Sequence, residues 1–380
     1  MLSRTGRAST RSLRWATNYR LPADIRRAGR LRSQPRSHST SSPPYRQEHN
    51  PKPKPGGSYT KILATFSLGI PLGFLLRSLN PDNEQIAKPT DFVKYQLVSK
   101  DDVSSTCSLF TLRPSGGPRL DHEQIHDARA LTSVQFKQPQ LQIARAYTVF
   151  PPTTDQAPDD LRFLIRKEKN GEMSRYLHRL PLLAEVEIRG PSTDFSLPDE
   201  VSEVLFLAGG TGIAPAMQVA QRLSGKADVH VLWACRRRED CAGGVSDAKQ
   251  PPRAGSSWFP SSWTSSGVEL IDDAAELPAN TVVRHIRFLK QPPDPVTSKL
   301  LIDYFVDEEG TQITPSHVAK LLHSGSNNTP GTRLLLISGP DGFVNHWAGP
   351  KEWLGGREVQ GRLGGELGEV DLGGWRVVKL

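Results

Sequence analysis

Residues 201–215 read Val-Ser-Glu-Val-Leu-Phe-Leu-Ala-Gly-Gly-Thr-Gly-Ile-Ala-Pro. A short apolar run ends in three closely spaced glycines, and a helical pattern follows as far as Ser224. A buried strand, a tight turn and a helix form the repeating unit of a parallel α/β sheet. Glycines at such a turn let a nucleotide phosphate approach backbone N–H groups, although similar turns also occur without a ligand.

Similar apolar runs follow further along the chain. They predict strands at residues 229–235, 281–289 and 332–339 of the same sheet. Residues 242–267 are rich in Gly, Ser and Pro, and predict a disordered surface insertion. We therefore expect a parallel α/β domain over residues 199–380.

The segment before this domain has a different pattern. From Asp91 to Pro191, short alternating or β-rich runs are separated by turn residues, with one helical stretch at 174–183. Many short strands with a single helix predict a small antiparallel β-barrel, which we place at residues 90–198.

Two motifs in the predicted barrel contain groups that could bind a phosphate or an aromatic ring system. Arg145-Ala-Tyr147-Thr148 offers a guanidinium for a pyrophosphate, an aromatic ring and a hydroxyl, although such a sequence is also common at strand edges. Gly171-Glu-Met-Ser174-Arg-Tyr-Leu177 predicts a turn into a helix, where N–H groups and a hydroxyl favour an anion. An ordinary N-cap at Ser174 is the alternative.

These motifs, followed by Arg189-Gly-Pro191 and the glycine-rich turn, occur in a fixed order, and this order is more specific than any one motif. The chain resembles the ferredoxin-reductase-like flavoproteins, and among them the NADH–cytochrome b5 reductase branch. The resemblance implies that the barrel binds FAD and that the α/β domain binds NADH or NADPH. It assigns cofactor binding to Arg145, Tyr147, Thr148, Arg166, Gly171, Met173, Ser174, Gly209, Gly210, Thr211, Gly212, Pro215, Gly339 and Pro340. The catalytic candidates are Thr211, near the flavin ring, and Ser338, near the nicotinamide.

The chain departs from this family after the last core strand. Ser338 stands where the family usually has a cysteine, and Asp341 adds a negative charge near the expected phosphates. The resemblance then implies intact FAD binding but slower hydride transfer. Arg236–Arg238 can select NADPH through its 2′-phosphate or form a solvated turn, and the sequence leaves both interpretations open.

The basic character of the chain is confined to its beginning. Residues 1–61 hold eleven Arg and three Lys against Asp24 and Glu48, a net charge of +12. Since the whole chain carries +8, the other residues carry −4, which does not favour a nucleic-acid-binding domain. An Arg- and Ser-rich stretch poor in acidic residues predicts a mitochondrial transit peptide at 1–40, with a disordered basic tail as the alternative.

A Pro- and Gly-rich linker at 41–58 precedes an apolar run at Ile62–Leu76, flanked by Lys61 and Arg77. We expect a single membrane span over residues 59–79, with a buried segment or an apolar sorting signal as alternatives. The basic N-terminal flank would stay in the matrix, so the following domains would face the intermembrane space.

Together, the motifs, presequence and anchor are similar to a fungal family of mitochondrial inner-membrane flavoproteins that assist cytochrome c maturation. The implied activity is reduction of haem iron before covalent haem attachment, with cytochrome c haem lyase and apocytochrome c or haem as partners. A general mitochondrial diaphorase and a non-catalytic assembly factor remain alternatives. His122 and His126 have no evident third ligand and no two cysteines have zinc-site spacing, so no metal is expected.

Overall fold

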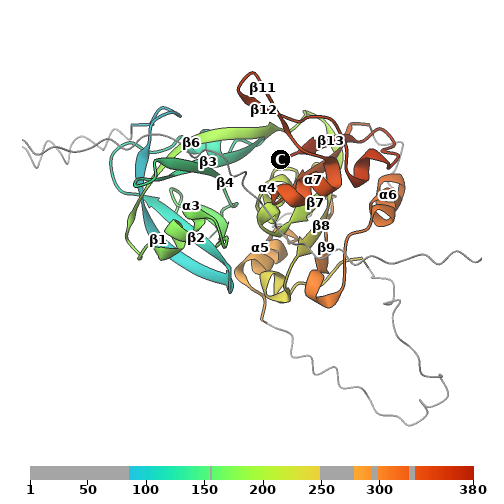
Figure 1. The fold of residues 1–380 in the computed structure, drawn as a ribbon, viewed down its shortest axis with the longest axis horizontal. Helices are drawn as coiled ribbons and strands as arrows, with labels where there is room; N and C mark the ends of the chain where they lie inside the picture. The colour runs from blue at the N-terminus through green and yellow to red at the C-terminus, as the bar shows by residue number, and fades with distance from the viewer. Residues whose placement is uncertain (1–84, 155, 249–277, 292–297, 325–329) are drawn as a thin grey trace, which may run out of the picture. The chain divides into compact units, whose positions relative to one another are not determined.

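The computed structural model describes residues 85–154, 156–248, 278–291, 298–324 and 330–380. An antiparallel sheet is followed by a parallel sheet, and a two-stranded hairpin lies near the C-terminus (Figure 1). The predicted transit peptide, linker and membrane span lie outside the described residues. Within the ranges just given, no helix is long and apolar enough to cross a membrane.

The predicted barrel is a curled six-stranded antiparallel sheet with the strand order β4-β3-β6-β1-β2-β5. It curls because the chain just after β4 returns to β5, where the Phe150 N–H donates to the Arg162 carbonyl at 2.7 Å. The strands are β1 (Val93–Ser104), β2 (Cys107–Pro114), β3 (Ala130–Gln138), β4 (Ile143–Thr148), β5 (Leu161–Arg166) and β6 (Glu185–Ser196). The helices are α2 (His122–Ile125) and α3 (Glu172–Arg179).

Alternation along β1 shows why this segment forms a half-buried strand. Val93, Tyr95 and Leu97 are buried inside the curl, while Lys94 between them faces solvent. The predicted helix at 174–183 is observed as α3, which begins two residues earlier and ends at Arg179, before Pro181. A proline cannot donate a helical hydrogen bond, so it favours this earlier end.

The second sheet is entirely parallel, with the strand order β13-β10-β7-β8-β9. The strands are β7 (Val201–Gly209), β8 (Asp228–Cys235), β9 (Leu300–Val306), β10 (Thr332–Ser338) and β13 (Arg376–Lys379). The helices are α4 (Ile213–Arg222), α5 (Thr281–Leu289), α6 (Pro315–Ser324) and α7 (Asp341–Ala348), with short 3-10 turns η1 (Gly210–Gly212), η2 (Arg238–Cys241), η3 (Asp307–Glu309) and η4 (Glu366–Gly368). The hairpin consists of β11 (Glu352–Leu354) and β12 (Arg357–Val359).

The prediction of a strand at 281–289 is wrong, because this segment is the helix α5. The Asn280 side chain accepts the Val283 N–H at 3.0 Å and caps the helix. Val283 and Ile286 are buried while Arg287 is exposed, which is helical spacing. The strand in this region is β9, which is not among the predicted strands.

The predicted insertion at 242–267 is only partly described, because residues 249–277 lie outside the described residues. Its beginning, 242–248, is an ordered cover of the edge strand rather than a free loop. The Asp247 N–H donates to the Ile302 carbonyl at 3.1 Å, and the Asp247 carboxylate accepts the Ile302 N–H at 2.7 Å. This covers the exposed hydrogen-bonding groups of β9.

One hydrophobic cluster connects the two sheets, because Leu131 and Phe150 of the first domain belong to the same cluster as Met217 on α4, while each sheet also has a cluster of its own. Gln218 of α4 adds a buried polar link. Its side chain accepts the Thr132 N–H at 2.9 Å and donates to the Thr132 and Val149 carbonyls at 3.0 and 2.6 Å. These contacts fix the glycine-rich turn beside the curled sheet.

Candidate functional site

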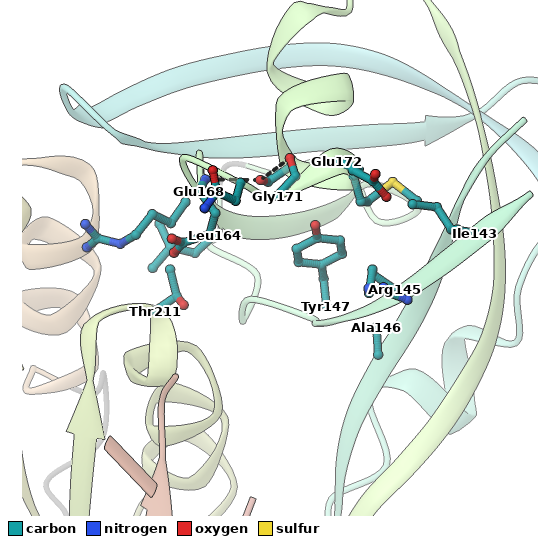
Figure 2. A pocket seen from close by; sticks show the side chains of 13 residues that line it. Ile143, Arg145, Ala146, Tyr147, Leu164, Glu168, Gly171, Glu172 and Thr211 are labelled. Atoms are coloured by element: carbon teal, nitrogen blue, oxygen red, sulfur yellow. Dashed lines mark hydrogen bonds between the residues drawn. The ribbon is translucent and has the colours of Figure 1, made fainter. Parts of the chain in front are cut away.

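A cavity of about 360 Å³ lies where the curled sheet meets the turn after β7 (Figure 2). This volume lies within the usual range of small-molecule sites. The cavity is lined by Ile143, Arg145, Ala146, Tyr147, Leu164, Arg166, Glu168, Asn170, Gly171, Glu172, Met173, Ser174 and Thr211. It brings together the two barrel motifs and one residue of the glycine-rich turn.

Strand β4 supplies the first group of lining residues. Ile143, Arg145 and Tyr147 alternate along it, as the period of a strand requires. The Arg145 side chain is exposed, and its guanidinium donates to the Ala144 carbonyl at 2.9 Å. It lies at the cavity with most of its donors available for a ligand.

Tyr147 is the aromatic side chain of the site. Its ring packs edge-on against Phe136 with centroids 5.1 Å apart, and its hydroxyl points toward the Gly171–Glu172 turn (Figure 2). Burial raises the pKa of Tyr147 to about 12. Its phenol therefore stays protonated at physiological pH, able to donate a hydrogen bond.

The turn before α3 is held by Ser174. Its hydroxyl accepts the Glu168 N–H at 3.1 Å and donates to the Gly171 carbonyl at 3.3 Å. Gly171, and not Ser174, is the N-cap of α3, so the alternative of a Ser174 N-cap is wrong. The Ser174 hydroxyl shapes the loop whose backbone faces the cavity.

Arg166 joins the cavity to the parallel sheet. Its guanidinium pairs with Asp240 of η2 at 2.8 Å, and the two side chains are 16% and 5% exposed. Burial alone would lower the pKa of Arg166, but the bond to Asp240 raises it. The Thr106 hydroxyl accepts a second Arg166 N–H at 3.1 Å. Arg166 is therefore fixed in its charged form at the cavity wall.

Close packing against the end of β10 requires glycine at one position of the glycine-rich turn. A Cβ on Gly212 would lie 2.2 Å from the Ser338 carbonyl oxygen, so only glycine lets the ends of β7 and β10 approach. Thr211 is the residue of this turn that faces the cavity (Figure 2). The cavity wall does not include Thr148, Gly209, Gly210, Gly212, Pro215, Ser338, Gly339 or Pro340.

Seven predicted residues do line the cavity: Arg145, Tyr147, Arg166, Gly171, Met173, Ser174 and Thr211. Their contacts with a cofactor remain a prediction. Ile143 and Glu168 are among the lining residues that the motifs do not predict. Strand alternation from Arg145 and Tyr147 would have indicated Ile143, whereas no sequence signal marks Glu168. No cluster of His, Cys, Asp and Glu in the described part of the chain has the geometry of a metal site.

The three predicted nucleotide-selecting arginines follow β8. Arg238 pairs with Glu309 at 2.5 Å through both carboxylate oxygens, and Arg237 pairs with Glu239 at 3.2 Å. The bond to Glu309 raises the pKa of Arg238. Two of the three guanidinium groups are thus committed to carboxylates at the carboxyl end of the sheet, where ligands of parallel α/β folds bind.

Residues 94–197 match a protein family described as the oxidoreductase FAD-binding domain. This segment, which contains most of the curled sheet, is similar to the FAD-binding domains of oxidoreductases. The resemblance to ferredoxin-reductase-like flavoproteins is therefore confirmed, together with the curled antiparallel sheet and the parallel second sheet.

Two curated proteins are similar to parts of the chain. The cytochrome c mitochondrial import factor of Saccharomyces cerevisiae is 33% identical over 136 residues, covering 32% of this chain and 37% of the relative. NADH-cytochrome b5 reductase 1 of Debaryomyces hansenii is 29% identical over 171 residues, covering 44% of this chain and 57% of the relative. The matches thus span between about a third and three fifths of these relatives.

Among solved structures, the cytochrome b5 reductase domain of Ulva prolifera nitrate reductase matches with a TM-score of 0.43 and 17% identity. The match covers 69% of this chain and 92% of that chain.

Proposed function

We propose that the chain is a mitochondrial FAD-dependent oxidoreductase that takes a hydride from NADH or NADPH and reduces haem iron during cytochrome c maturation. The observation that carries this proposal is the set of residues that line the cavity beside the turn after β7. Residues from three segments far apart in the sequence, Arg145 and Tyr147, Gly171 and Ser174, and Thr211, line it together.

The residues of the cavity fit FAD. The Arg145 guanidinium supplies charge and paired donors for the pyrophosphate, and the first residues of α3 line the same space, where helix N–H groups would favour an anion. The Tyr147 ring offers an apolar surface with one donor, and the Thr211 hydroxyl offers a polar contact from the opposite side. Arg166, held by its ion pair with Asp240, adds a guanidinium in a fixed position to the cavity wall.

FAD, when bound, accepts two electrons as a hydride and releases them singly, which suits the reduction of haem iron. The chain's own residues would bind and orient it. Ser174 keeps the 168–171 loop closed, and Phe136 holds the Tyr147 ring edge-on. Since Tyr147 remains protonated, it would add no negative charge to the cavity when the cofactor is bound.

Similarity to the yeast import factor supports the role in cytochrome c maturation, and its name supports a mitochondrial location. We further propose the inner membrane, with the folded domains in the intermembrane space, on the basis of the presequence and the apolar run at 62–76. Apocytochrome c or haem, and cytochrome c haem lyase, are the proposed partners. The net charge of −4 outside residues 1–61 would favour a basic partner.

The test is an anaerobic absorbance spectrum of the full chain purified in detergent, before and after NADH and then NADPH. A flavin spectrum that bleaches with either nucleotide, followed by reduction of added ferric haem, is the expected result. Bound flavin that neither nucleotide bleaches would refute the nucleotide-dependent reaction. Failure to bind flavin, even after reconstitution, would refute the flavoenzyme itself.

A second candidate is an assembly factor that retains the fold without the chemistry. Phe343 favours it, because its ring packs against the end of β7, where a Cβ on Gly209 would lie 2.7 Å away. This ring occupies space beside the turn at which a nucleotide would bind. Rescue of cytochrome c assembly in a deletion strain by the flavin-free double variant Arg145→Ala, Ser174→Ala would support this candidate.

The same strain distinguishes a third candidate, a general diaphorase related to the NADH-cytochrome b5 reductases. Normal haem attachment to cytochrome c in the deletion strain would favour that broader role. A defect in haem attachment that the intact chain restores, and the flavin-free variant does not, is the result expected for the proposed haem reductase.

A further inference from the structure

The hairpin of β11 and β12 has an unusual combination of order and exposure. Its strands pair from Glu352–Val359 to Leu354–Arg357, and the turn is Gly355-Gly356 with φ of +59° and +75°. Two successive residues with positive φ give the turn whose twist matches the two strands it joins. The hairpin is therefore built to hold one shape.

Its base is fixed by a buried cation. The Lys379 ammonium donates to the Pro350 carbonyl at 2.8 Å, on the arm that enters the hairpin, and to the Arg362 carbonyl at 2.9 Å, on the arm that leaves it. Gln360 bonds the backbone N–H and carbonyl of Lys379 at 2.7 and 2.9 Å. Both arms are thus tied to the end of β13, while the tip extends away from it (Figure 1).

The tip exposes two large apolar side chains. Trp353 is 74% exposed and Leu354 is 73% exposed, and consecutive strand residues point to opposite faces. All six strand residues are exposed. A single protein groove would cover one face of this hairpin, whereas the interface of a bilayer surrounds both faces at once.

The charges at the tip also favour a bilayer. The Glu358 carboxylate pairs with Lys351 at 3.0 Å, and the Glu352 carboxylate accepts the Arg362 N–H at 3.3 Å. Arg357, next to the turn, forms no ion pair within the described ranges, so it is available for an anionic headgroup. Tryptophan beside such a cation is typical of segments that lie at a membrane interface.

We infer that this hairpin is a second membrane contact, which inserts Trp353 and Leu354 into the interface of the bilayer that anchors the chain. The inference rests on the proposed membrane location. Only residues 80–84 separate the predicted span at 59–79 from Gln85, and extended chain of that length reaches at most about 20 Å. A domain tethered so closely lies against the bilayer, where an exposed apolar hairpin can reach it.

The experiment labels the tip in the full chain. Cys107, Cys235 and Cys241 are all buried, so Leu354→Cys supplies an accessible thiol for an environment-sensitive fluorophore. The labelled chain is reconstituted into phosphatidylcholine vesicles that contain an anionic phospholipid, with or without a lipid that carries a nitroxide quencher. The expected result is emission at shorter wavelength that the nitroxide lipid quenches.

Ser224→Cys is the matched control. Ser224 is exposed and lies before β8, at the amino end of the parallel sheet, whereas the hairpin is tied to the carboxyl end of β13. Its label should stay in water and escape quenching. Adding Trp353→Glu to the Leu354→Cys chain should return the tip label toward the emission of this control.

Other outcomes separate the inference from the proposed location and function. Vesicles that carry the chain while the tip label remains in water would overturn the hairpin contact and leave the membrane anchor intact. A tip label that is shielded but not quenched by nitroxide lipid, increasingly so at higher protein content, would assign the hairpin to a second copy. A chain that does not float with vesicles would overturn both the anchor and the contact. None of these readouts depends on flavin.

Discussion

Arg145 and Ser174 were both predicted to meet the FAD pyrophosphate, but their surroundings differ. The Arg145 guanidinium is exposed and bonds to the neighbouring Ala144 carbonyl, whereas the Ser174 hydroxyl is bonded within the 168–171 loop. A free donor can act directly on a ligand, and a bonded hydroxyl acts through the shape of its loop. Substituting Arg145 should therefore remove a direct contact to the ligand, whereas substituting Ser174 should change the shape of the 168–171 loop.

Arg145→Ala should weaken FAD binding with little effect on folding. Losing a charge-assisted contact to phosphate costs about 1.5–3 kcal/mol, or roughly ten- to a hundredfold in Kd. The exposed side chain contributes little to the core, so the midpoint of urea unfolding of the flavin-free chain should not move. Flavin titration measures the affinity. Arg145→Lys keeps the charge without the paired donors, so intermediate affinity is expected; unchanged affinity in the alanine variant would remove Arg145 from the site.

His285 on α5 should make the fold sensitive to acid. Both its ring nitrogens lack hydrogen-bond partners in the described part of the chain, and its ring packs 4.9 Å from Phe150. Burial lowers the pKa of His285 to about 3, and the Arg162 charge adds to this effect. Below pH 6.5 the unfolded chain takes up a proton that the folded chain excludes, so stability falls as the pH decreases toward 3.

At pH 5 the loss attributable to this one histidine is about 2 kcal/mol relative to neutral pH. His285→Leu should reduce the slope of unfolding free energy against pH, measured by urea unfolding between pH 7 and 4.5. His323, which is exposed, gives the control variant His323→Gln. Equal slopes in the parent and the His285 variant would contradict the assignment.

At the scale of elements, the sequence predicted strands and helices correctly where the hydrophobic periodicity and the turn residues agreed. The β7–turn–α4 unit was predicted from residues 201–224, and its neighbours β8 and β10 from continuous apolar runs. The prediction of a strand at 281–289 was wrong because a nine-residue segment with adjacent valines fits both the helical and the strand period. Only the Asn280 cap indicates the helix. Strand β9 was missed because its polar Asp303 interrupts the run, and His230 on the neighbouring strand pairs with it at 2.8 Å.

The turn between β7 and α4 should tolerate no side chain at Gly212. The Cβ of Gly212→Ala would lie 2.2 Å from the Ser338 carbonyl oxygen, a backbone atom that cannot move aside alone. Overpacking of this kind costs about 1–3 kcal/mol or more, measured as a loss in urea-unfolding free energy. Gly342→Ala is the control, because no atom lies within 4 Å of its added Cβ on α7 and alanine favours a helix by about 0.5–1 kcal/mol. Equal effects of the two substitutions would contradict this packing argument.

At the scale of the molecule, the order of motifs predicted two domains but not how they touch. Contacts such as Gln218 with Thr132, or Arg166 with Asp240, join residues more than seventy positions apart, and no periodicity encodes such pairs. Contacts between residues far apart in the sequence also explain why only some of the cavity's lining residues were predicted. Its motif residues were recognisable, but Leu164 and Glu168 line it only because β5 curls back beside β4.

Asp240→Ala should test the link between the two sheets. It would leave the Arg166 guanidinium largely buried without its carboxylate, and removing one partner of a buried pair costs about 3–5 kcal/mol. The Ser104 hydroxyl, which donates to Asp240 at 2.7 Å, would lose its acceptor as well. Glu185→Ala breaks the pair with Lys94, and it should change the unfolding free energy little because water screens an exposed ion pair. Urea unfolding compares the two, and a similar small cost for both would show that the pair does not hold the sheets together.

The charges at the carboxyl ends of β8 and β9 lead us to predict that the proposed reductase uses NADH faster than NADPH. Arg237 and Arg238, which could have met a 2′-phosphate, are paired with Glu239 and Glu309. A phosphate would have to displace a carboxylate from Arg238 and would then lie beside that carboxylate, so like charges would oppose it. The rate of flavin bleaching per unit nucleotide concentration should therefore be higher with NADH in anaerobic stopped-flow experiments.

Glu309→Gln is the variant that isolates this effect. It keeps the size of the side chain, removes the charge that holds Arg238 and should raise the NADPH rate relative to NADH by about tenfold, the equivalent of one charge-assisted contact near 1.4 kcal/mol. Asp199→Asn, which neutralises an exposed carboxylate paired with Arg129 just before β3, controls for the change in net charge. If the intact chain already prefers NADPH, Arg236 must supply the recognition, because it is the one arginine of the three whose side chain forms no ion pair within the described ranges.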